Sequence, residues 1–245
     1  YFQLESHYPK HIKFVHPLML NSIANQLHVS PKCVGSFDWE GRSTKRFRQE
    51  IREFLGYREA TLRDVDNLKT WLSKEVFQQA VKRPQQIEHA YTYFRDNKIE
   101  PFTSKELDRH IRSAHKEFEQ DLFLSIDDKL LTKTKQMIDA ILSDDDEAED
   151  AKITDEIAVK FHHLKKDTPD AKLKNVDHAI QKINCLEKLE LPEDLFNNFS
   201  IKLIMKYYTR LMAERPSNLL EYKSHVRYAL FSLFCYFRKQ YLTDG

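Results

Sequence analysis

The sequence has few of the residues that a sheet protein needs at its turns. Only 4 glycines and 8 prolines occur among 245 residues, and 31% of the residues are charged. Strands need frequent tight turns, in which Gly and Pro are favoured. With 41% hydrophobic residues, including 16 Phe and 11 Tyr, the chain has enough material for a packed core. This composition predicts an all-α fold.

Cysteine is also scarce. Cys33, Cys185 and Cys235 lie far apart, and no pair has the CxxC spacing of a zinc finger. An odd number of scattered cysteines argues against a disulfide framework and suits a reducing compartment. We therefore expect a cytoplasmic protein with neither disulfides nor structural zinc.

Long hydrophobic runs are absent as well. The longest, Tyr228 to Phe237, is bracketed by Arg227 and Arg238 and is shorter than the roughly 20 residues that span a bilayer. The first residues, Tyr1-Phe2-Gln3-Leu4, lack the pattern of a signal peptide and resemble a helix already under way. We expect no membrane association, and we expect further residues upstream of Tyr1.

The net charge of +1 hides an uneven distribution along the chain. Residues 1–126 carry 20 Lys and Arg against 17 Asp and Glu, and residues 151–245 carry 16 against 12. Residues 127–150 carry 3 against 9, and they include the acidic run from Asp144 to Asp150. A run of like charges cannot pack into a core and is typical of a solvated linker. We therefore predict two helical domains, 1–143 and 152–245, joined by an acidic linker at 144–151.

Apolar residues at three- and four-residue spacing divide the chain into helices. Ser104 can cap a long helix whose apolar face includes Leu107 and Ile111. Gly56 is a typical stop for an earlier helix. The last helix is apolar nearly all round, and we expect it at the centre of its domain. The expected helices are 18–27, 31–37, 44–55, 61–81, 87–97, a long one from 104, 153–164, 176–189, 200–213 and 218–242.

Residues 23–34 have the spacing of a helix-turn-helix. Ile23, Ala24 and Leu27 supply the inner face of a first helix, and Ser30 can cap a second. The small Ala24 side chain would let the two helices cross closely. The same pattern also occurs in ordinary helical hairpins. Under the DNA-binding interpretation, the second helix lies in or near a major groove.

The most basic stretch lies between residues 42 and 58, with six Lys and Arg against two acidic residues. Its apolar residues form one stripe of a helix, whereas Lys45, Arg48 and Arg52 line up on a different face. Basic helix faces suit phosphate contacts, each of which releases counterions. The alternative is a solvated surface on which these cations pair with nearby glutamates.

Two further basic groups are weaker candidates. Arg109, Arg112 and Lys116 form a stripe along the long helix, but neighbouring acidic residues dilute it, which favours a solvated face. Arg227 and Arg238 lie eleven residues apart and therefore share one side of the final helix. They would either face DNA or pair with acidic residues inside their domain.

No catalytic or metal-binding constellation is evident. His7 and His11 have i,i+4 spacing but lack the glutamate base and third ligand that a zinc protease needs. His162 and His163 are neighbours and cannot point the same way from a helix. Cys33 has only distant histidines, which is weak support for a nucleophile pair. We therefore expect no catalytic residue and no metal site in this chain.

Four stretches, in the same order along the chain, carry a family resemblance. They are Phe37-Asp38-Trp39-Glu40-Gly41-Arg42-Ser43-Thr44-Lys45-Arg46-Phe47-Arg48 with Glu50-Ile51-Arg52 and Leu55-Gly56-Tyr57-Arg58; Tyr1-Phe2-Gln3-Leu4 with Tyr8-Pro9; Ile99-Glu100-Pro101 with Leu107 and Arg112-Ser113-Ala114; and Arg227-Tyr228-Ala229-Leu230-Phe231-Ser232-Leu233-Phe234, running to Leu242-Thr243-Asp244. Together they resemble the N-terminal region of the Tn-three family of replicative transposases, most weakly across 130–175. Phe47 departs from the family, which often has histidine there. If that histidine contacts DNA, the contact is lost here and Phe47 is a core residue.

The resemblance implies that the chain is part of a longer enzyme. Members of the family carry an RNase-H-like catalytic domain with an Asp-Asp-Glu triad and magnesium, and that domain would lie beyond Gly245. This chain would retain the non-catalytic part, which binds the terminal inverted repeats of the transposon for replicative DNA transposition. Its partners would be double-stranded DNA and the rest of the transposase, including a second copy of the full-length protein. It would need no cofactor of its own.

A second interpretation is an all-α protein-interaction or dimerisation module of the same assembly with little DNA affinity. The near-zero net charge supports it, because many isolated DNA-binding domains are strongly basic. Under the DNA-binding interpretation, the cation of the second short helix reaches base edges, the cations of 42–58 hold phosphates, and the second domain extends the footprint. The candidate DNA-binding residues are Lys32, Arg42, Lys45, Arg46, Arg48, Arg52, Arg58, Arg109, Arg112, Lys165, Lys166, Arg227 and Arg238.

Overall fold

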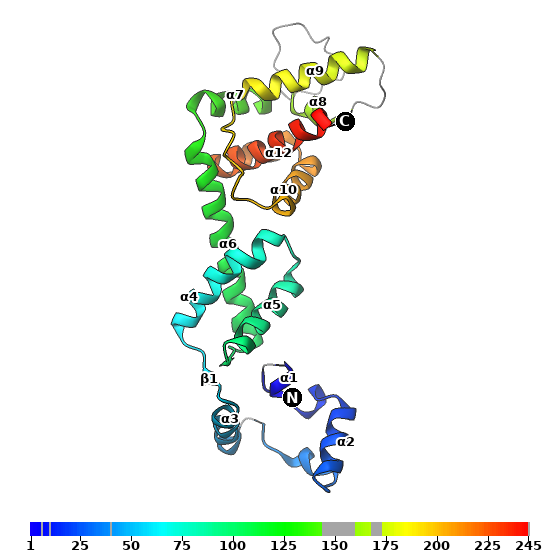
Figure 1. Ribbon diagram of the computed structural model, residues 1–245, viewed down its shortest axis with the longest axis vertical. Helices are drawn as coiled ribbons and strands as arrows, with labels where there is room; N and C mark the ends of the chain where they lie inside the picture. Colours follow the sequence, from blue (N-terminus) through cyan, green and yellow to red (C-terminus); the bar gives the residue numbers. More distant parts are fainter. Residues whose placement is uncertain (6, 10, 40, 144–159, 168–172, 245) are drawn as a thin grey trace. The chain divides into compact units, whose positions relative to one another are not determined.

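The protein is almost entirely helical in the computed structural model (Figure 1). Helices make up 76% of it, which confirms the all-α fold class. Among the residues that the structure describes, the two-residue strands β1 (Arg58–Glu59) and β2 (Ile99–Glu100) form the single parallel pair. None of the described helices is long and apolar enough to cross a membrane. The described residues are 1–5, 7–9, 11–39, 41–143, 160–167 and 173–244.

The chain divides into two compact units. The first unit contains Tyr1–Val76 and Val81–Ala114, and the second contains Phe77–Ala80 and His115–Gly245. The division falls inside helix α6 (Ser104–Lys129) and not at residue 143, where we expected the first domain to end. Helix α7 (Thr132–Ser143) lies in the second unit because its apolar residues are buried in the core of that unit. The expected acidic linker at 144–151 lies outside the described residues.

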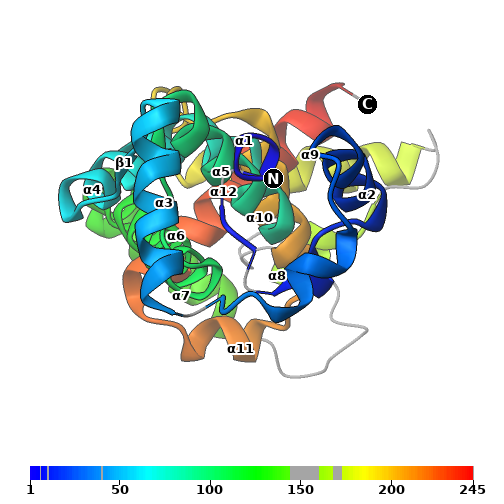
Figure 2. The ribbon, with the colours of Figure 1, turned by 90° about the horizontal axis from the view of Figure 1, so that it is seen from below.

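Short elements dominate the beginning of the first unit. The expected helix 31–37 is a 3₁₀ helix, because a segment of six residues with Gly35 in its interior has a weak propensity for the α form. In Figure 2, one side of helix α3 lies in front with no other element over it. The elements are α1 (Phe2–Glu5), the 3₁₀ helix Ile12–Phe14, α2 (Pro17–Gln26), the 3₁₀ helix Pro31–Ser36, α3 (Arg42–Leu55), α4 (Leu62–Trp71), the π-helical turn Leu72–Val76, α5 (Arg83–Asp96) and the first part of α6.

The ends of α3 and α6 follow from local sequence. Gly56 ends α3 in the left-handed conformation, with a φ of 70°, as its position in the sequence predicts. The expected cap of α6, Ser104, is instead its first residue. The capping interactions come from Thr103, whose backbone N–H donates to the Glu106 carboxylate at 3.2 Å while its hydroxyl accepts from the Glu106 backbone N–H at 3.4 Å. The long helix therefore begins where predicted, with the cap one residue earlier.

The core of the first unit is built by α4, α5 and the first part of α6. Leu68, Phe94, Leu107 and Ile111 are fully buried. Residues before α4 contribute little to burial. Among the described residues in that stretch, Phe2 and Ala24 are the buried apolar side chains.

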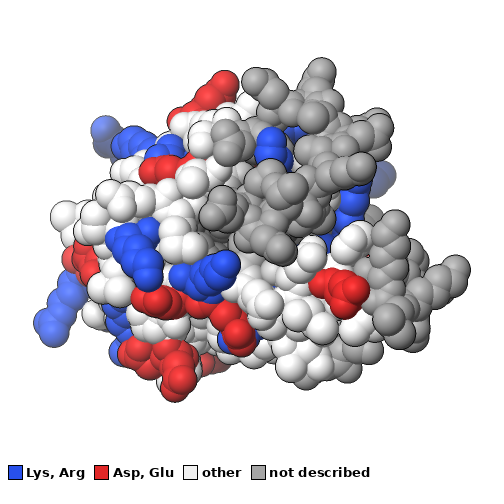
Figure 3. Space-filling view, turned by 90° about the horizontal axis from the view of Figure 1, so that it is seen from above, with Lys and Arg blue, Asp and Glu red and all other residues white. Residues whose placement is uncertain are grey.

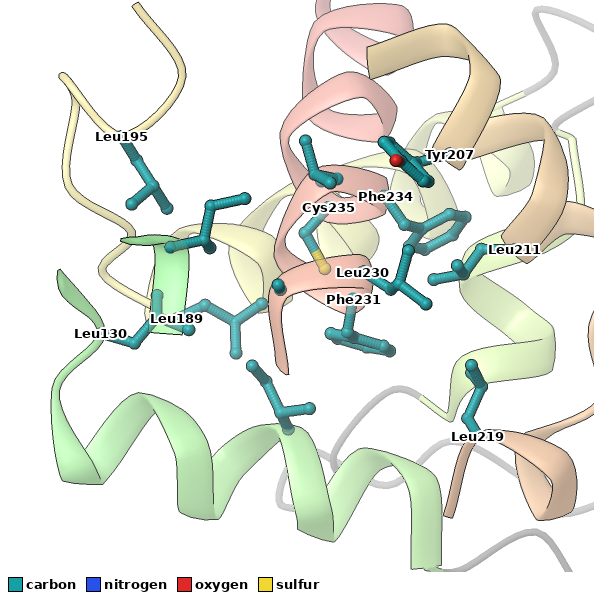
Figure 4. Packing of buried hydrophobic residues seen from close by; sticks show 14 of the residues in the cluster. Leu130, Leu189, Leu195, Tyr207, Leu211, Leu219, Leu230, Phe231, Phe234 and Cys235 are labelled. Carbon is teal, nitrogen blue, oxygen red and sulfur yellow. The ribbon is translucent and has the colours of Figure 1, made fainter. Parts of the chain in front are cut away.

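The second unit surrounds helix α12 (Figure 4). Every residue from Ala229 to Cys235 is buried, which agrees with the central position expected for the last helix. The expected helix 218–242 is interrupted, because Tyr222 has an extended backbone that ends one helix before the next begins. The other elements of this unit are the 3₁₀ helix Phe77–Gln79, α8 (Phe161–Lys165), α9 (Leu173–Lys188), α10 (Ile201–Ala213) and α11 (Pro216–Glu221), with α12 spanning Ser224–Asp244.

Candidate nucleic-acid interface

The outer face of α3 carries exposed cations. Arg42, Lys45, Arg46 and Gln49 share this face because they recur every three or four residues, and all four are exposed. Arg46 pairs with Glu50 at 3.3 Å, but both side chains are largely in solvent, so the pair holds the cation weakly. The first turn of α3 contains no acidic residue. Because cations there oppose the helix dipole, a phosphate bound to this face would relieve an unfavourable charge arrangement.

Arg48 lies on the inner side of α3 against the N-terminal segment. Its guanidinium is 5.1 Å from the centre of the Tyr8 ring, and its backbone carbonyl accepts a hydrogen bond of 2.9 Å from the Tyr8 hydroxyl. Burial, with a smaller effect from Glu100, raises the pKa of Tyr8 to about 12. Tyr8 is therefore a neutral donor at physiological pH, and Arg48 is only partly available to a ligand.

Arg52 and Arg58 hold the first unit together. Arg52 bonds to Glu59 and Glu100, each at 2.6 Å, and its side chain is only 14% exposed. Burial raises the pKa of Glu100, and the hydrogen bond from Arg52 opposes that rise. Arg58 makes two 2.7 Å bonds to the buried Asp64 and holds the pKa of that carboxyl well below its ordinary range. Both arginines, expected on phosphates, have acidic partners within their own unit.

The expected helix-turn-helix packing does not form. Ala24 is buried as predicted, but Leu27 is 65% exposed, and Ile23 and Val29 are exposed too. Of the inner face that Ile23, Ala24 and Leu27 were expected to supply, Ile23 and Leu27 are therefore exposed to solvent. A 3₁₀ helix has fewer residues per unit length than an α-helix and cannot offer the same complementary ridge.

Lys32 lies at the beginning of this 3₁₀ helix. The Ser30 hydroxyl accepts from the Lys32 backbone N–H at 3.3 Å, as predicted for a cap. The Lys32 side chain is exposed. Its contact with base edges stays a prediction, since a 3₁₀ segment presents fewer side chains to a groove than a recognition helix.

The basic stripe of α6 is diluted by acidic neighbours, as its composition suggested. Arg112 pairs with Asp108 at 2.9 Å, and the same aspartate accepts from Arg83. Arg109 and Lys116 are exposed. Arg109, in the first unit, remains a candidate for a DNA contact.

In the second unit, Arg238 is a buried structural residue. Its side chain is 1% exposed, and its guanidinium donates to the carbonyls of Leu164 and Lys166 at 2.7 and 2.6 Å and to Asp167 at 2.7 Å. These bonds hold the end of α8 against α12. The guanidinium has no solvent-facing surface for DNA, which corrects the expectation that it contacts the repeat.

The other cations of the second unit are partly engaged. Arg227 pairs with Asp139 at 3.0 Å, which is the alternative that its sequence position left open. The Lys165 ammonium donates to the carbonyl of Glu214, whereas the Lys166 side chain is exposed. On the face seen in Figure 3, basic and acidic side chains are interspersed among the described residues. The first unit therefore offers the stronger candidate surface.

A cavity of about 400 Å³ beside α3 was missed in the sequence. The sequence does carry a signal for this cavity, because aromatic residues precede α3 and recur on the apolar stripe of α3. The gap between the N-terminal segment and α3 could not be inferred from spacing alone. The lining residues are Tyr1, Phe2, Tyr8, Pro9, Phe37, Trp39, Thr44, Phe47, Arg48, Ile51, Phe54 and Leu55.

Histidines and cysteines do not assemble into a metal centre in the part of the chain that is described. No group of three or more His, Cys, Asp or Glu side chains there could hold an ion. The His7 ring interacts with the carbonyl of Glu5 at 2.8 Å. Cys33 is exposed, Cys185 and Cys235 are buried, and none of these three cysteines is in a disulfide.

The comparisons with known proteins agree with the division into units. Residues 1–114 match the family model described as Domain of unknown function (DUF4158). The match ends at Ala114, the residue at which the first unit ends. No curated protein matches the chain. The first unit is thus both a compact body and a recurring sequence module.

Proposed function

We propose that the first unit is a DNA-binding domain that contacts duplex DNA through the exposed basic face of α3. The observation that carries this proposal is the exposure of Arg42, Lys45 and Arg46 on one face of a helix without an acidic first turn. Cations in this arrangement match successive phosphates of a duplex and release counterions on binding. Arg109 and Lys32 are further exposed cations of the same unit that we propose for contacts with DNA.

The DNA that we propose is the terminal inverted repeat of a transposon. Two observations support this choice: the stretches that resemble Tn-three family transposases, and the match of residues 1–114 to a domain that is found in such transposases. The chain would then act as the non-catalytic part of the enzyme, bound to the nucleoid in the bacterial cytoplasm. Magnesium and strand cleavage would belong to the catalytic domain of the parent protein.

A fluorescence-anisotropy titration tests the proposal. The probes are the terminal inverted repeat and a scrambled duplex of equal length, each at low and physiological salt. Tighter binding to the repeat is expected, with an affinity that falls steeply as salt rises. Equal and salt-insensitive binding to both duplexes contradicts the proposal.

A charge-matched pair of variants locates the surface. Replacing Arg42, Lys45 and Arg46 by Gln should weaken binding at least about tenfold and reduce the salt slope by about 0.9 for each lost phosphate contact. The control replaces three other exposed cations of the first unit by Gln, so that net charge changes equally. If both triple variants weaken binding equally, long-range charge and not the α3 face explains the affinity. The control residues are Arg63, Lys74 and Lys105.

A second candidate function is protein assembly through the first unit. Its support is the exposure of large apolar side chains, including Leu18 at 72% and Phe54 at 86%. Sedimentation velocity at several protein concentrations separates the two candidates. A concentration-dependent dimer with no duplex affinity favours assembly, whereas a monomer that binds the repeat favours DNA recognition.

A further inference from the structure

The apolar side of α3 borders the aromatic cavity. Phe47, Ile51 and Phe54 lie on the stripe of α3 that faces away from Arg42 and Lys45, and all three remain partly or largely exposed. The cavity volume of about 400 Å³ falls within the ~300–1,000 Å³ of small-molecule sites. A single helix therefore presents cations on one side and an open apolar cavity on the other.

Flat rings make up much of the wall. Phe37 lies between Trp39, with ring centres 5.1 Å apart and nearly perpendicular planes, and Phe47, with ring centres 6.2 Å apart and an interplanar angle of 28°. Phe2 and Tyr8, which also line the cavity, stack with their ring centres 4.5 Å apart. Such a wall favours a planar aromatic ligand over a branched aliphatic one, because offset-stacked and edge-to-face contacts are both available.

The rim of the cavity is cationic. Arg48 lines it, with its guanidinium over the Tyr8 ring, and the Arg46 guanidinium lies 5.4 Å from the centre of the Phe47 ring that also lines it. None of the described residues that line this cavity is acidic. The complementary ligand is therefore aromatic and attached to a negative charge, as a nucleobase is to its phosphodiester.

We propose that the cavity receives an unstacked nucleobase from the strand whose phosphates bind α3. This inference rests on the proposed DNA-binding function and adds a second mode of recognition to it. The basic face would hold the backbone, and one base at a frayed, kinked or single-stranded position would leave the stack and enter between the rings. Unstacking a base costs least at such positions, so the site selects nucleic acid that is locally open.

A pair of oligonucleotides with equal charge tests the cavity. One is oligothymidylate of about eight nucleotides, within the ~4–16 nucleotides that single-strand sites cover, and the other is an abasic strand of the same length. The chain contains two tryptophans, and Trp71 packs on Tyr93 outside the cavity. In the Trp71→Phe variant, Trp39 therefore reports occupancy by fluorescence quenching.

Oligothymidylate should bind about tenfold more tightly than the abasic strand, and only oligothymidylate should quench Trp39. Phe54→Ala removes a lining ring whose exposure means that the fold does not depend on it, and it should reduce the tenfold preference. Leu62→Ala, at an equally exposed apolar residue outside the cavity, should leave the preference intact.

The outcomes separate this inference from the proposed function. Equal binding of both strands without quenching overturns the base site, and if blunt duplex still binds, the α3 phosphate surface stands. Failure to bind duplex and both strands overturns the two proposals together. Quenching of Trp39 that depends on protein concentration without any nucleic acid identifies a second copy of the chain as the occupant and overturns the base site.

Discussion

Helices α3 and α12 each carry apolar and basic residues, yet their own units bury them to very different extents. All residues from Ala229 to Cys235 of α12 are buried, whereas α3 buries only Thr44 among its described residues. The apolar stripe of α3 is left beside an open cavity. A helix that is covered by its own chain serves stability, and one that is left uncovered is available to a ligand.

The cations of the two helices differ in the same way. On α12, Arg238 is buried against backbone carbonyls and Arg227 pairs with Asp139. On α3, Arg42 and Lys45 are exposed. Each arginine of α12 bonds to residues of its own unit, whereas Arg42 and Lys45 of α3 are exposed and add nothing to packing. Their exposure on one face of the helix is the physical basis of the proposed phosphate contacts.

The largest expected effect is at the centre of the second unit. Phe234→Ala should lower the free energy of unfolding by about 3–5 kcal/mol, because a fully buried ring that contacts Phe161 and Tyr208 leaves a cavity. Urea unfolding followed by circular dichroism measures the loss. Gln240→Ala, at an exposed position of α12, is the control. A loss below about 1 kcal/mol would mean that α12 is not the centre of a cooperative core.

The second prediction concerns the buried arginine of α12. Arg238→Met should cost about 2–4 kcal/mol, because the carbonyls of Leu164 and Lys166 lose their donors. Urea unfolding of the second unit measures this cost. Lys239→Met removes a neighbouring, exposed cation that pairs with Glu187 and should cost less than about 1 kcal/mol. Equal losses in the free energy of unfolding for Arg238→Met and Lys239→Met would show that the buried bonds of Arg238 stabilise the unit no more than an exposed ion pair does.

The third prediction probes the first unit by its pH dependence. Asp64→Asn should lower the free energy of unfolding at neutral pH by about 2 kcal/mol, because it breaks the pairing with Arg58 and the capping bonds from Thr61. The pKa of Asp64 is lowered in the folded protein. Its contribution is therefore fully present above the unfolded pKa of about 3.9 and is lost as pH falls below it.

Tryptophan fluorescence measures this change, because Trp39 and Trp71 both lie in the first unit. The stability difference between wild type and Asp64→Asn should be constant from about pH 7 to 5 and shrink in more acidic solution. Thr61→Ala, which leaves the Arg58 pair in place, should show a smaller difference. A difference between wild type and Asp64→Asn that does not depend on pH would contradict the role of this ion pair.

Helix positions were largely predictable from the sequence, because apolar spacing and the helix stop at Gly56 are local signals. Charge placed the predicted domain boundary at the acidic run, whereas the two compact units divide inside α6 and α7 is buried in the core of the second unit. A count of charges along the sequence cannot detect tertiary packing.

The candidate site was predictable only in part. Spacing placed Lys45, Arg48 and Arg52 on one face of a helix, but it could not say which of them meets an acid. Glu59 and Glu100, the partners of Arg52, are brought to it by the chain reversal after α3 and by the β1–β2 pair. The aromatic cavity depends on long-range approach of the N-terminal segment, for which the sequence carries no local signal.

The smallest expected effect is at Leu27. This prediction tests whether the first unit is as open as the comparison with the second unit requires. In a packed helix-turn-helix Leu27 would be a core residue, and Leu27→Gln would cost about 2–5 kcal/mol. With Leu27 65% exposed, the substitution should change the free energy of unfolding by less than about 0.5 kcal/mol. Tryptophan fluorescence during urea unfolding measures it, with Leu68→Gln in the buried core of α4 as the strongly destabilising reference. A large loss at Leu27 would mean that α2 packs as a helix-turn-helix in solution, and the contrast between an open first unit and a closed second unit would disappear.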